Sequence, residues 1–292
     1  MNLNLTERTE LNRSWSKAVL RVFDSPDTYL NQLSELAQNE SMAQYATDWN
    51  GIDLQRIPKH LRQGVANMFA QFHYGETAGL LCVSRLKKLG VPHSLNKFFE
   101  IQVVEEARHV KWLSKLMQKL DCDTEVNTHS EQLMNAIHEC GSAEGIVLGI
   151  HTFVEGLAHS YCLDAAQAFS KNTSLRLVSK SYRVASKVIG EWFPTLIGRD
   201  EARHIAFGTY FLKKLIPELS LAERDELEAL ADKLGSIIAA GALHPDLVFA
   251  PEVDGSTIGA RSIARVNQQL AEIGLEARIP DVYGSNGNHK NI

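Results

Sequence analysis

The sequence predicts an all-α protein, and three observations support this fold class. Apolar residues recur every three or four positions through several long segments, which is the spacing of one buried helix face. Signals for helix ends separate these segments: Pro58 and Ser220 stand where helices are expected to begin, and Gly90 where one ends. A five-residue motif also occurs twice, as EEARH over residues 105–109 and as DEARH over residues 200–204.

The first 57 residues are expected to form an N-terminal covering region. Residues 7–48 have the pattern of two or three short amphipathic helices, with a break at residues 24–26 (Asp-Ser-Pro). Residues 49–57 are expected to link them to the core. No residue of this region indicates a chemical role, so we expect it to cover one end of the helical core.

The next two helices each carry a glutamate on their apolar face. Helices are predicted over residues 58–89 and 95–120, with Glu76 and Glu106 inside the respective apolar stripes. If the second helix returns antiparallel to the first, both glutamates lie at the same depth. A buried carboxylate without a partner costs several kcal/mol, so each needs a metal ion, a cation or a proton. For Glu76, a distant arginine is the alternative partner.

A polar turn at 121–127 and a short helix at 129–140 lead to a long helix over residues 143–170. Its inner face carries His151, Glu155 and His159. Glu155 is the third expected carboxylate, and the two histidines lie one helical turn on either side of it. Each histidine is a candidate extra ligand or proton donor, but a buried histidine bonded to a carbonyl is the commoner case. Asp164 lies on the opposite helix face and is a weaker candidate than Glu155.

The second half of the chain is less regular. Residues 172–192 are expected to form a separate or kinked helical piece, broken at Pro194. The following helix carries Glu201 and His204 and is expected to end near residue 217. C-terminal helices are predicted over about 220–240 and 257–276 within a region spanning 217–283, with an irregular stretch at 241–256. The tail at 284–292 is expected to be disordered. We expect one domain overall.

The two copies of the five-residue motif predict a site for two metal ions, with each copy supplying the ligands of one half. Residues three apart share a helix face, so Glu106 faces the same way as His109, and Glu201 the same way as His204. One Glu-x-x-His arises often by chance, whereas two, each preceded by a glutamate on an apolar helix face, form a specific pattern. Four carboxylates and two imidazoles carry a charge of −4 and balance two divalent ions. Oxygen and imidazole donors suit iron or manganese.

This order of ligands resembles the ferritin-like di-iron carboxylate superfamily, whose four-helix bundles carry Glu, Glu-x-x-His, Glu and Glu-x-x-His. The resemblance covers about residues 58–216. It is closest to the branch of ribonucleotide reductase small subunits, ligand-binding oxidases, acyl-carrier desaturases and arylamine N-oxygenases. It implies a ferritin-like four-helix bundle with additional N- and C-terminal helices and a cofactor of two iron ions, with Mn/Fe as the alternative. The implied ligands are Glu76, Glu106, His109, Glu155, Glu201 and His204.

The resemblance also implies contacts around the ligands. In these families the acid before each Glu-x-x-His reaches the opposite histidine, so Asp200 is expected to hold His109, and Glu105 to hold His204. The residues expected in this outer layer are Glu105, Arg108, Asp200 and Arg203. The alternative for Glu105 and Arg108 is that both are solvated charges on the helix surface.

Three positions at which the sequence differs from the family patterns limit the range of reactions expected. Leu113 stands where reductase subunits place a radical tyrosine, Ile150 where the ligand-binding oxidases place one, and Ile197 where the N-oxygenases place a histidine. We therefore expect an O2-dependent oxygenase or oxidase that acts on a small organic substrate, such as an amine, an amino acid or an acyl chain. The alternatives are a radical-generating reductase subunit and a non-catalytic metal-storage bundle.

Composition sets the remaining expectations. The net charge of −5 and a pI of about 6.1 argue against nucleic-acid binding. Neither a signal peptide nor an apolar run of membrane-spanning length is evident. The four cysteines form no C-x-x-C pair and are expected to be reduced. We therefore expect a cytoplasmic enzyme, with an electron-donor protein as partner and a homodimer as the commonest assembly.

Overall fold

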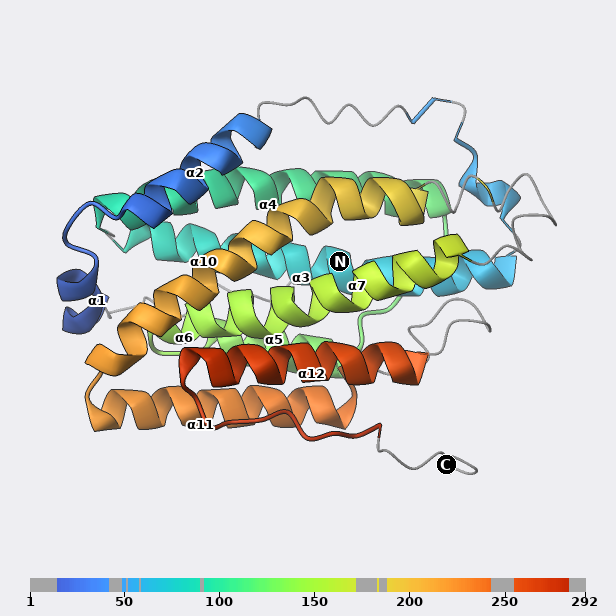
Figure 1. Cartoon of the computed structure of the whole chain (residues 1–292). Coiled ribbons are helices and arrows are strands. Elements are labelled where there is room, and N and C mark those ends of the chain that lie inside the picture. Colours follow the sequence, from blue (N-terminus) through green and yellow to red (C-terminus); the bar gives the residue numbers. More distant parts are fainter. Residues whose placement is uncertain are drawn as a thin grey trace.

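The computed structural model describes residues 15–41, 49–50, 52–57, 59–89, 92–171, 183, 188–242 and 255–283. These residues are mostly helical and include no strand, which confirms the predicted fold class (Figure 1). Within these ranges, no helix combines the length and apolarity that crossing a membrane requires.

Four long helical segments run side by side and form the bundle (Figure 1). The first two, α3 and α4, pack along each other, and α10 packs against η2 and α7. The bundle segments are α3 (Lys59–Lys88), α4 (His93–Leu120), α7 (Glu155–Lys171) with the preceding α6 (Ala143–Val147) and η2 (Leu148–Val154), and α10 (Arg199–Leu215).

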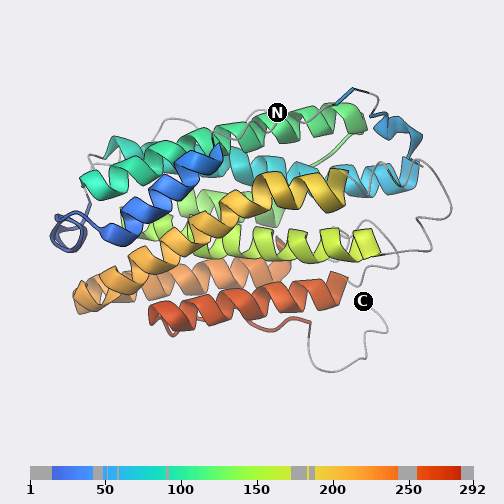
Figure 2. The same cartoon turned by 45° about the horizontal axis from the view of Figure 1, so that its top comes forward.

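Further helices cover the bundle on two sides. On one side, α2 lies against α4 and α10 (Figure 2). On the other, α12 packs along α7, and α11 lies beside η2 and α5. The covering elements are α1 (Lys17–Val22), α2 (Thr28–Ser41), η1 (Leu54–Arg56), α5 (Thr128–His138), η5 (Ile216–Glu218), α11 (Leu221–Ile237), η6 (Ile238–Ala242) and α12 (Gly255–Ile273).

Most predicted helix ends agree with the structure to within a few residues. The hydroxyl of Ser220 accepts a hydrogen bond from the backbone N–H of Glu223, whose carboxylate accepts one from the backbone N–H of Ser220, so α11 begins with a complete capping box. At the end of α4, Asp121 takes a left-handed conformation with φ of 49°.

The structure differs from the predicted helices at two places, and both contain π-helical turns. The long helix predicted over 143–170 forms, but η2 lies within it, immediately before Glu155. The expected break at Pro194 is wrong, because helical residues continue from Val188 to Leu215. A π-type turn, η3 (Val188–Trp192), precedes this proline, and a second, η4 (Pro194–Gly198), begins at it. Their wider spacing accommodates a residue that lacks a backbone N–H.

Three expectations fall largely on residues outside the described ranges. These are the irregular stretch at 241–256, the disordered tail at 284–292, and the helical piece at 172–192, of which only 183 and 188–192 are described.

Two hydrophobic clusters surround the middle of α4. Phe98 and Phe99 belong to one cluster, which includes Phe207 of α10, and the rings of Phe98 and Phe207 stack with centroids 4.0 Å apart. Trp112 and Leu113 belong to the second cluster. Glu106 and His109 lie between these two apolar parts of α4, so the polar residues of the bundle stand at its mid-depth.

Candidate metal centre

The six residues predicted as ligands converge from four helices. Glu76 comes from α3, Glu106 and His109 from α4, Glu155 from α7, and Glu201 and His204 from α10. Glu76 is half-buried, and the other five are buried. Carboxylate and imidazole atoms of these residues form two adjoining groups compatible with metal binding.

The first group surrounds His109. Its Nδ1 lies 3.1 Å from Oε2 of Glu76 and 3.2 Å from Oε1 of Glu201. Oε2 of Glu106 lies 4.0 Å from the same nitrogen. We call this group the His109 side of the centre.

The second group surrounds His204. Its Nδ1 lies 3.3 Å from Oε1 of Glu106, 3.5 Å from Oε1 of Glu155 and 3.7 Å from Oε2 of Glu201. We call this group the His204 side. Glu106 and Glu201 present one oxygen to each side, so each carboxylate would reach both metal positions. Glu76 contacts His109 and Glu155 contacts His204, which is the placement of terminal ligands.

The cluster contains buried polar atoms that a metal would satisfy. Oε2 of Glu155, Oε1 of Glu201 and Nδ1 of His204 are buried and make no hydrogen bond of good geometry among the described residues, although the latter two lie near His109 and Glu106. Leaving such atoms unpaired costs about 1–3 kcal/mol each, and more for charged groups. The ligand charge of −4 matches two divalent ions, and oxygen with imidazole donors suits iron and manganese. The residues present therefore fit a dinuclear Fe/Fe or Mn/Fe cofactor.

Burial and neighbouring charges shift the pKa values of the cluster residues. Burial, followed by the nearby Glu76 and Glu201 carboxylates, raises the pKa of Glu106 well above its usual value. Burial raises the pKa of Glu155 to about 7. Burial disfavours the charged form of His109, but carboxylates, first that of Glu76, outweigh this and raise its pKa well above the usual value. Metal ions must displace any proton on these groups when they bind.

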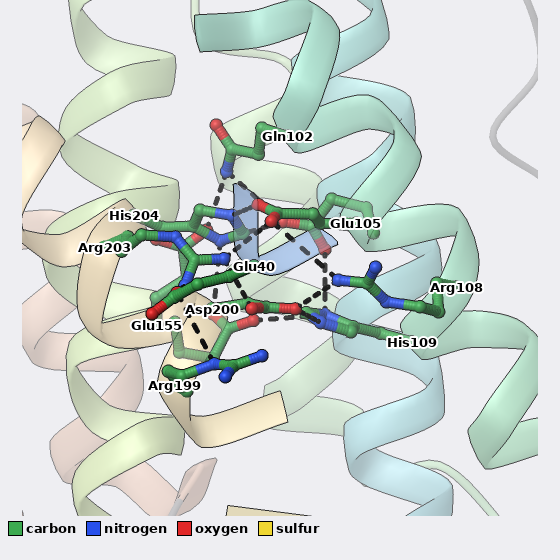
Figure 3. Close-up of polar contacts among 12 residues, drawn as sticks. Glu40, Gln102, Glu105, Arg108, His109, Glu155, Arg199, Asp200, Arg203 and His204 are labelled. Carbon is green, nitrogen blue, oxygen red and sulfur yellow. Dashed lines mark hydrogen bonds and ion pairs between the residues drawn. The ribbon is translucent and has the colours of Figure 1, made fainter. Parts of the chain in front are cut away.

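Both histidines are held from behind by acids (Figure 3). Nε2 of His109 lies 3.1 Å from Oδ2 of Asp200, and Nε2 of His204 lies 3.0 Å from Oε2 of Glu105. When each Nε2–H donates to its acid, the Nδ1 lone pair faces the cluster, as metal ligation requires. These are the pairings that the family resemblance implies. Glu105 is only 1% exposed, so it is not a solvated surface charge.

Two arginines complete this outer layer. Arg108 donates to Asp200, and Arg203 donates to Glu105 over 2.6 Å and also to Asp200. Arg203 pairs in addition with Glu40 of α2, which connects the covering helix to the centre (Figure 3). Sequence reasoning missed Glu40, because a pairing across so many residues leaves no local pattern.

Gln102 was also missed, although its sequence position gave a signal. It lies one helical turn before Glu106 on the same face of α4 and is fully buried. Its side chain contacts Glu106, Glu155 and His151. Gln102 could therefore have been predicted to face the centre on the same ground as Glu106, as a polar residue within the apolar stripe.

The remaining candidates lie outside the two groups. His151 contacts Gln102 and is buried, and burial lowers its pKa to about 3. His159 is half-buried beside the centre. Asp164 accepts from Arg265 over 3.4 Å. Glu191, which lies ten residues before Glu201 and is followed by an aromatic-rich segment rather than a histidine, is exposed.

A cavity of about 120 Å³ adjoins the centre. Glu76, Glu106, Glu155 and Glu201 form its polar wall. The rest of the lining is mainly apolar and includes Met68, Phe72, Ile150, Phe153, Leu157 and Phe193. An apolar space beside converging carboxylates is the usual form of a small-molecule site.

Comparison with known proteins supports the fold. No family model and no curated protein matches the chain. Among solved structures, a point mutant of an R2-like ligand-binding oxidase with an aerobically reconstituted Mn/Fe cofactor aligns with a TM-score of 0.63 and 17% identity, over 85% of this chain and 94% of its own. A second mutant, with an anaerobically reconstituted Mn/Fe cofactor, gives 0.60 and 18% over 84% and 93%. The chain therefore has the ferritin-like helical fold of these oxidases, as the resemblance implied.

Proposed function

We propose that this chain is an O2-dependent di-metal oxidoreductase, an oxidase or oxygenase, that acts on a small organic substrate. The observation that carries this proposal is the placement of two facing half-sites, with shared carboxylates, against an apolar cavity. The six residues of the cluster are proposed as ligands of two iron ions, or of one manganese and one iron. The Mn/Fe cofactors named for the structural relatives support this choice.

Bound metal ions of this kind supply redox chemistry towards O2. The protein's own residues have separate tasks. Asp200 and Glu105 fix the ring orientation of the two histidines, and Arg108 and Arg203 hold those acids in place by pairing with them. The apolar cavity lining excludes water and orients an uncharged part of the substrate beside the carboxylates.

The proposed reaction has further requirements. Turnover as an oxidase or oxygenase needs O2, a substrate and a source of electrons, for which we propose an electron-donor protein. Cys82, Cys122 and Cys140 are free thiols, which agrees with a reducing cytoplasm. A homodimer is proposed as the assembly. Amines, amino acids and acyl chains remain the proposed substrate classes, and the apolar lining favours those with an uncharged end.

The proposal is tested by loading the metal-free chain with ferrous iron without oxygen and then adding O2. Metal-dependent O2 uptake that increases with an apolar amine or acyl compound supports it. A stable organic radical without substrate oxidation indicates a radical-generating subunit instead. Slow uptake with accumulation of mineral iron indicates storage. Absence of O2 uptake by the iron-loaded protein contradicts the proposal.

Filling the cavity is expected to separate substrate turnover from metal binding. Ala158 lies on α7 between Glu155 and His159 and lines the cavity. The variant Ala158→Phe places a ring in this small space and is expected to lower substrate-dependent O2 uptake by about tenfold or more. The metal content is expected to remain unchanged, and Ala158→Ser is the matched control. Unchanged turnover in the phenylalanine variant would show that substrate binds elsewhere.

A further inference from the structure

The outer layer of the centre is not symmetric. Each histidine is held by one acid, but only the His204 side has an additional amide among the described residues, that of Gln102. Nε2 of Gln102 lies 3.2 Å from Oε1 of Glu106 and 3.1 Å from Oε1 of Glu155. These are the two carboxylate oxygens that approach Nδ1 of His204 most closely.

The orientation of the Gln102 amide follows from the charges around it. Carboxylates that hold a metal ion are ionised and only accept hydrogen bonds, whereas an amide NH2 has two N–H groups to donate. One N–H therefore serves Glu106 and the other Glu155, and the amide carbonyl points away from the centre. There it meets Nε2 of His151 at 3.1 Å. A carbonyl only accepts, so His151 donates to Gln102 in the tautomer that carries its proton on Nε2; the backbone oxygen of Val147, 3.1 Å from Nδ1, then receives no hydrogen bond from the neutral ring.

The surrounding structure fixes His151 for this contact. Its side chain is 1% exposed, and Nδ1 lies 3.1 Å from the backbone oxygen of Val147, in the helical turn that leads into η2. The ring of Phe207 packs against it with centroids 5.3 Å apart. Gly208 lets α10 approach so closely that a Cβ there would lie 2.2 Å from Cβ of His151. The imidazole therefore has little freedom to turn away from Gln102.

We propose that Gln102, oriented by His151, is a positioning residue mainly for the metal position on the His204 side, because both carboxylate oxygens that it contacts face that side. Its two N–H groups hold the terminal carboxylate of Glu155 and the bridging carboxylate of Glu106 in a fixed relation. The two metal positions therefore differ in how rigidly their ligands are held. This inference rests on the proposed metal centre.

The test measures Mn(II) binding under anaerobic conditions in two variants, each of which retains only one of the two metal positions. Glu76→Ala disables the His109 side, and Glu155→Ala disables the His204 side. Loss of an outer hydrogen-bond partner typically lowers metal affinity roughly 10–100-fold. Gln102→Leu is expected to cause a loss of this size in the Glu76→Ala background. In the Glu155→Ala background the change is expected to be less than about threefold, because the two substitutions share one interaction.

His151 variants supply the matched control. His151→Leu is expected to weaken Mn(II) binding on the His204 side in the same direction as Gln102→Leu, and His151→Gln is expected to restore it, because its amide can also donate to Gln102. Asp200→Asn is expected to show the opposite asymmetry, with its loss confined to the His109 side. Circular dichroism of the metal-free variants checks that each chain is still helical. Differences in Mn(II) affinity then reflect the positioning of the ligands and not a loss of the fold.

The outcomes separate two failures. Equal Mn(II) losses in both backgrounds, or no loss in either, would overturn the role of Gln102 and leave the metal centre intact. Failure of the unsubstituted chain to bind Mn(II) or Fe(II) would instead remove the proposed function on which the inference rests.

Discussion

Glu106→Ala is expected to remove bound metal while the chain stays helical. Glu106 presents Oε2 to the His109 side and Oε1 to the His204 side, so its loss removes a donor from both. The affinity loss is expected to exceed the roughly 10–100-fold that follows loss of an outer hydrogen bond. Metal analysis of purified protein gives the content, and circular dichroism gives the helicity. Glu201→Ala is expected to behave in the same way, because that carboxylate also reaches both sides.

For Glu106→Ala, retained helicity is expected because the folded chain disfavours the ionised form of this carboxylate. Burial, and then repulsion from neighbouring carboxylates, raises the pKa of Glu106, so holding it ionised there costs free energy. Removing it therefore relieves the metal-free chain. Glu191→Ala is the control: this glutamate is exposed and is expected to leave the metal content unchanged. Metal content like that of the unsubstituted chain in Glu106→Ala or Glu201→Ala would rule out the assigned ligands.

Gly208→Ala is expected to destabilise the chain by about 1–3 kcal/mol, the usual cost of overpacking a core. The added Cβ would lie 2.2 Å from Cβ of His151 and 2.9 Å from its Cγ. These atoms are close to the backbone of η2, so the ring cannot simply rotate away. The intrinsic helix preference for alanine, about 0.5–1 kcal/mol, acts in the opposite direction and does not compensate. Urea or thermal unfolding of the metal-free protein measures the change.

Gly75→Ala is the matched control for this prediction. Gly75 also lies within a bundle helix, but a Cβ there would meet only Cγ1 of Val154, at 4.0 Å. Its substitution is expected to raise the free energy of unfolding by up to about 1 kcal/mol. Equal or greater stability of Gly208→Ala would show that α10 does not approach η2 as closely as described.

The sequence carried enough information to predict the four bundle helices and the convergence of the six cluster residues. The reason is local periodicity: a Glu-x-x-His pair shares a helix face wherever it occurs, and an inward glutamate such as Glu76 stands out in an apolar stripe. Whether these residues ligate metal stays a prediction. The comparison with solved structures establishes the shared fold and supports the choice of cofactor.

The missed features have non-local or geometric causes. Glu40 meets Arg203 through the packing of α2 on α10, which depends on the whole bundle. The π-helical turns around Pro194 and before Glu155 depend on small differences in hydrogen-bond register that no residue pattern reveals. His151 is an inward histidine whose ring nitrogens face two carbonyl oxygens, those of Val147 and Gln102, which is the commoner case expected for such a histidine. It lies outside the candidate ligand set.

The most direct test of the account is anomalous diffraction from crystals of the protein loaded with iron and manganese, measured at the absorption edge of each metal. The account predicts two peaks about 3.5–4 Å apart, with Glu106 and Glu201 between them, Glu76 and His109 beside one, and Glu155 and His204 beside the other. A single peak, or metal bound away from these side chains, would contradict the proposed centre.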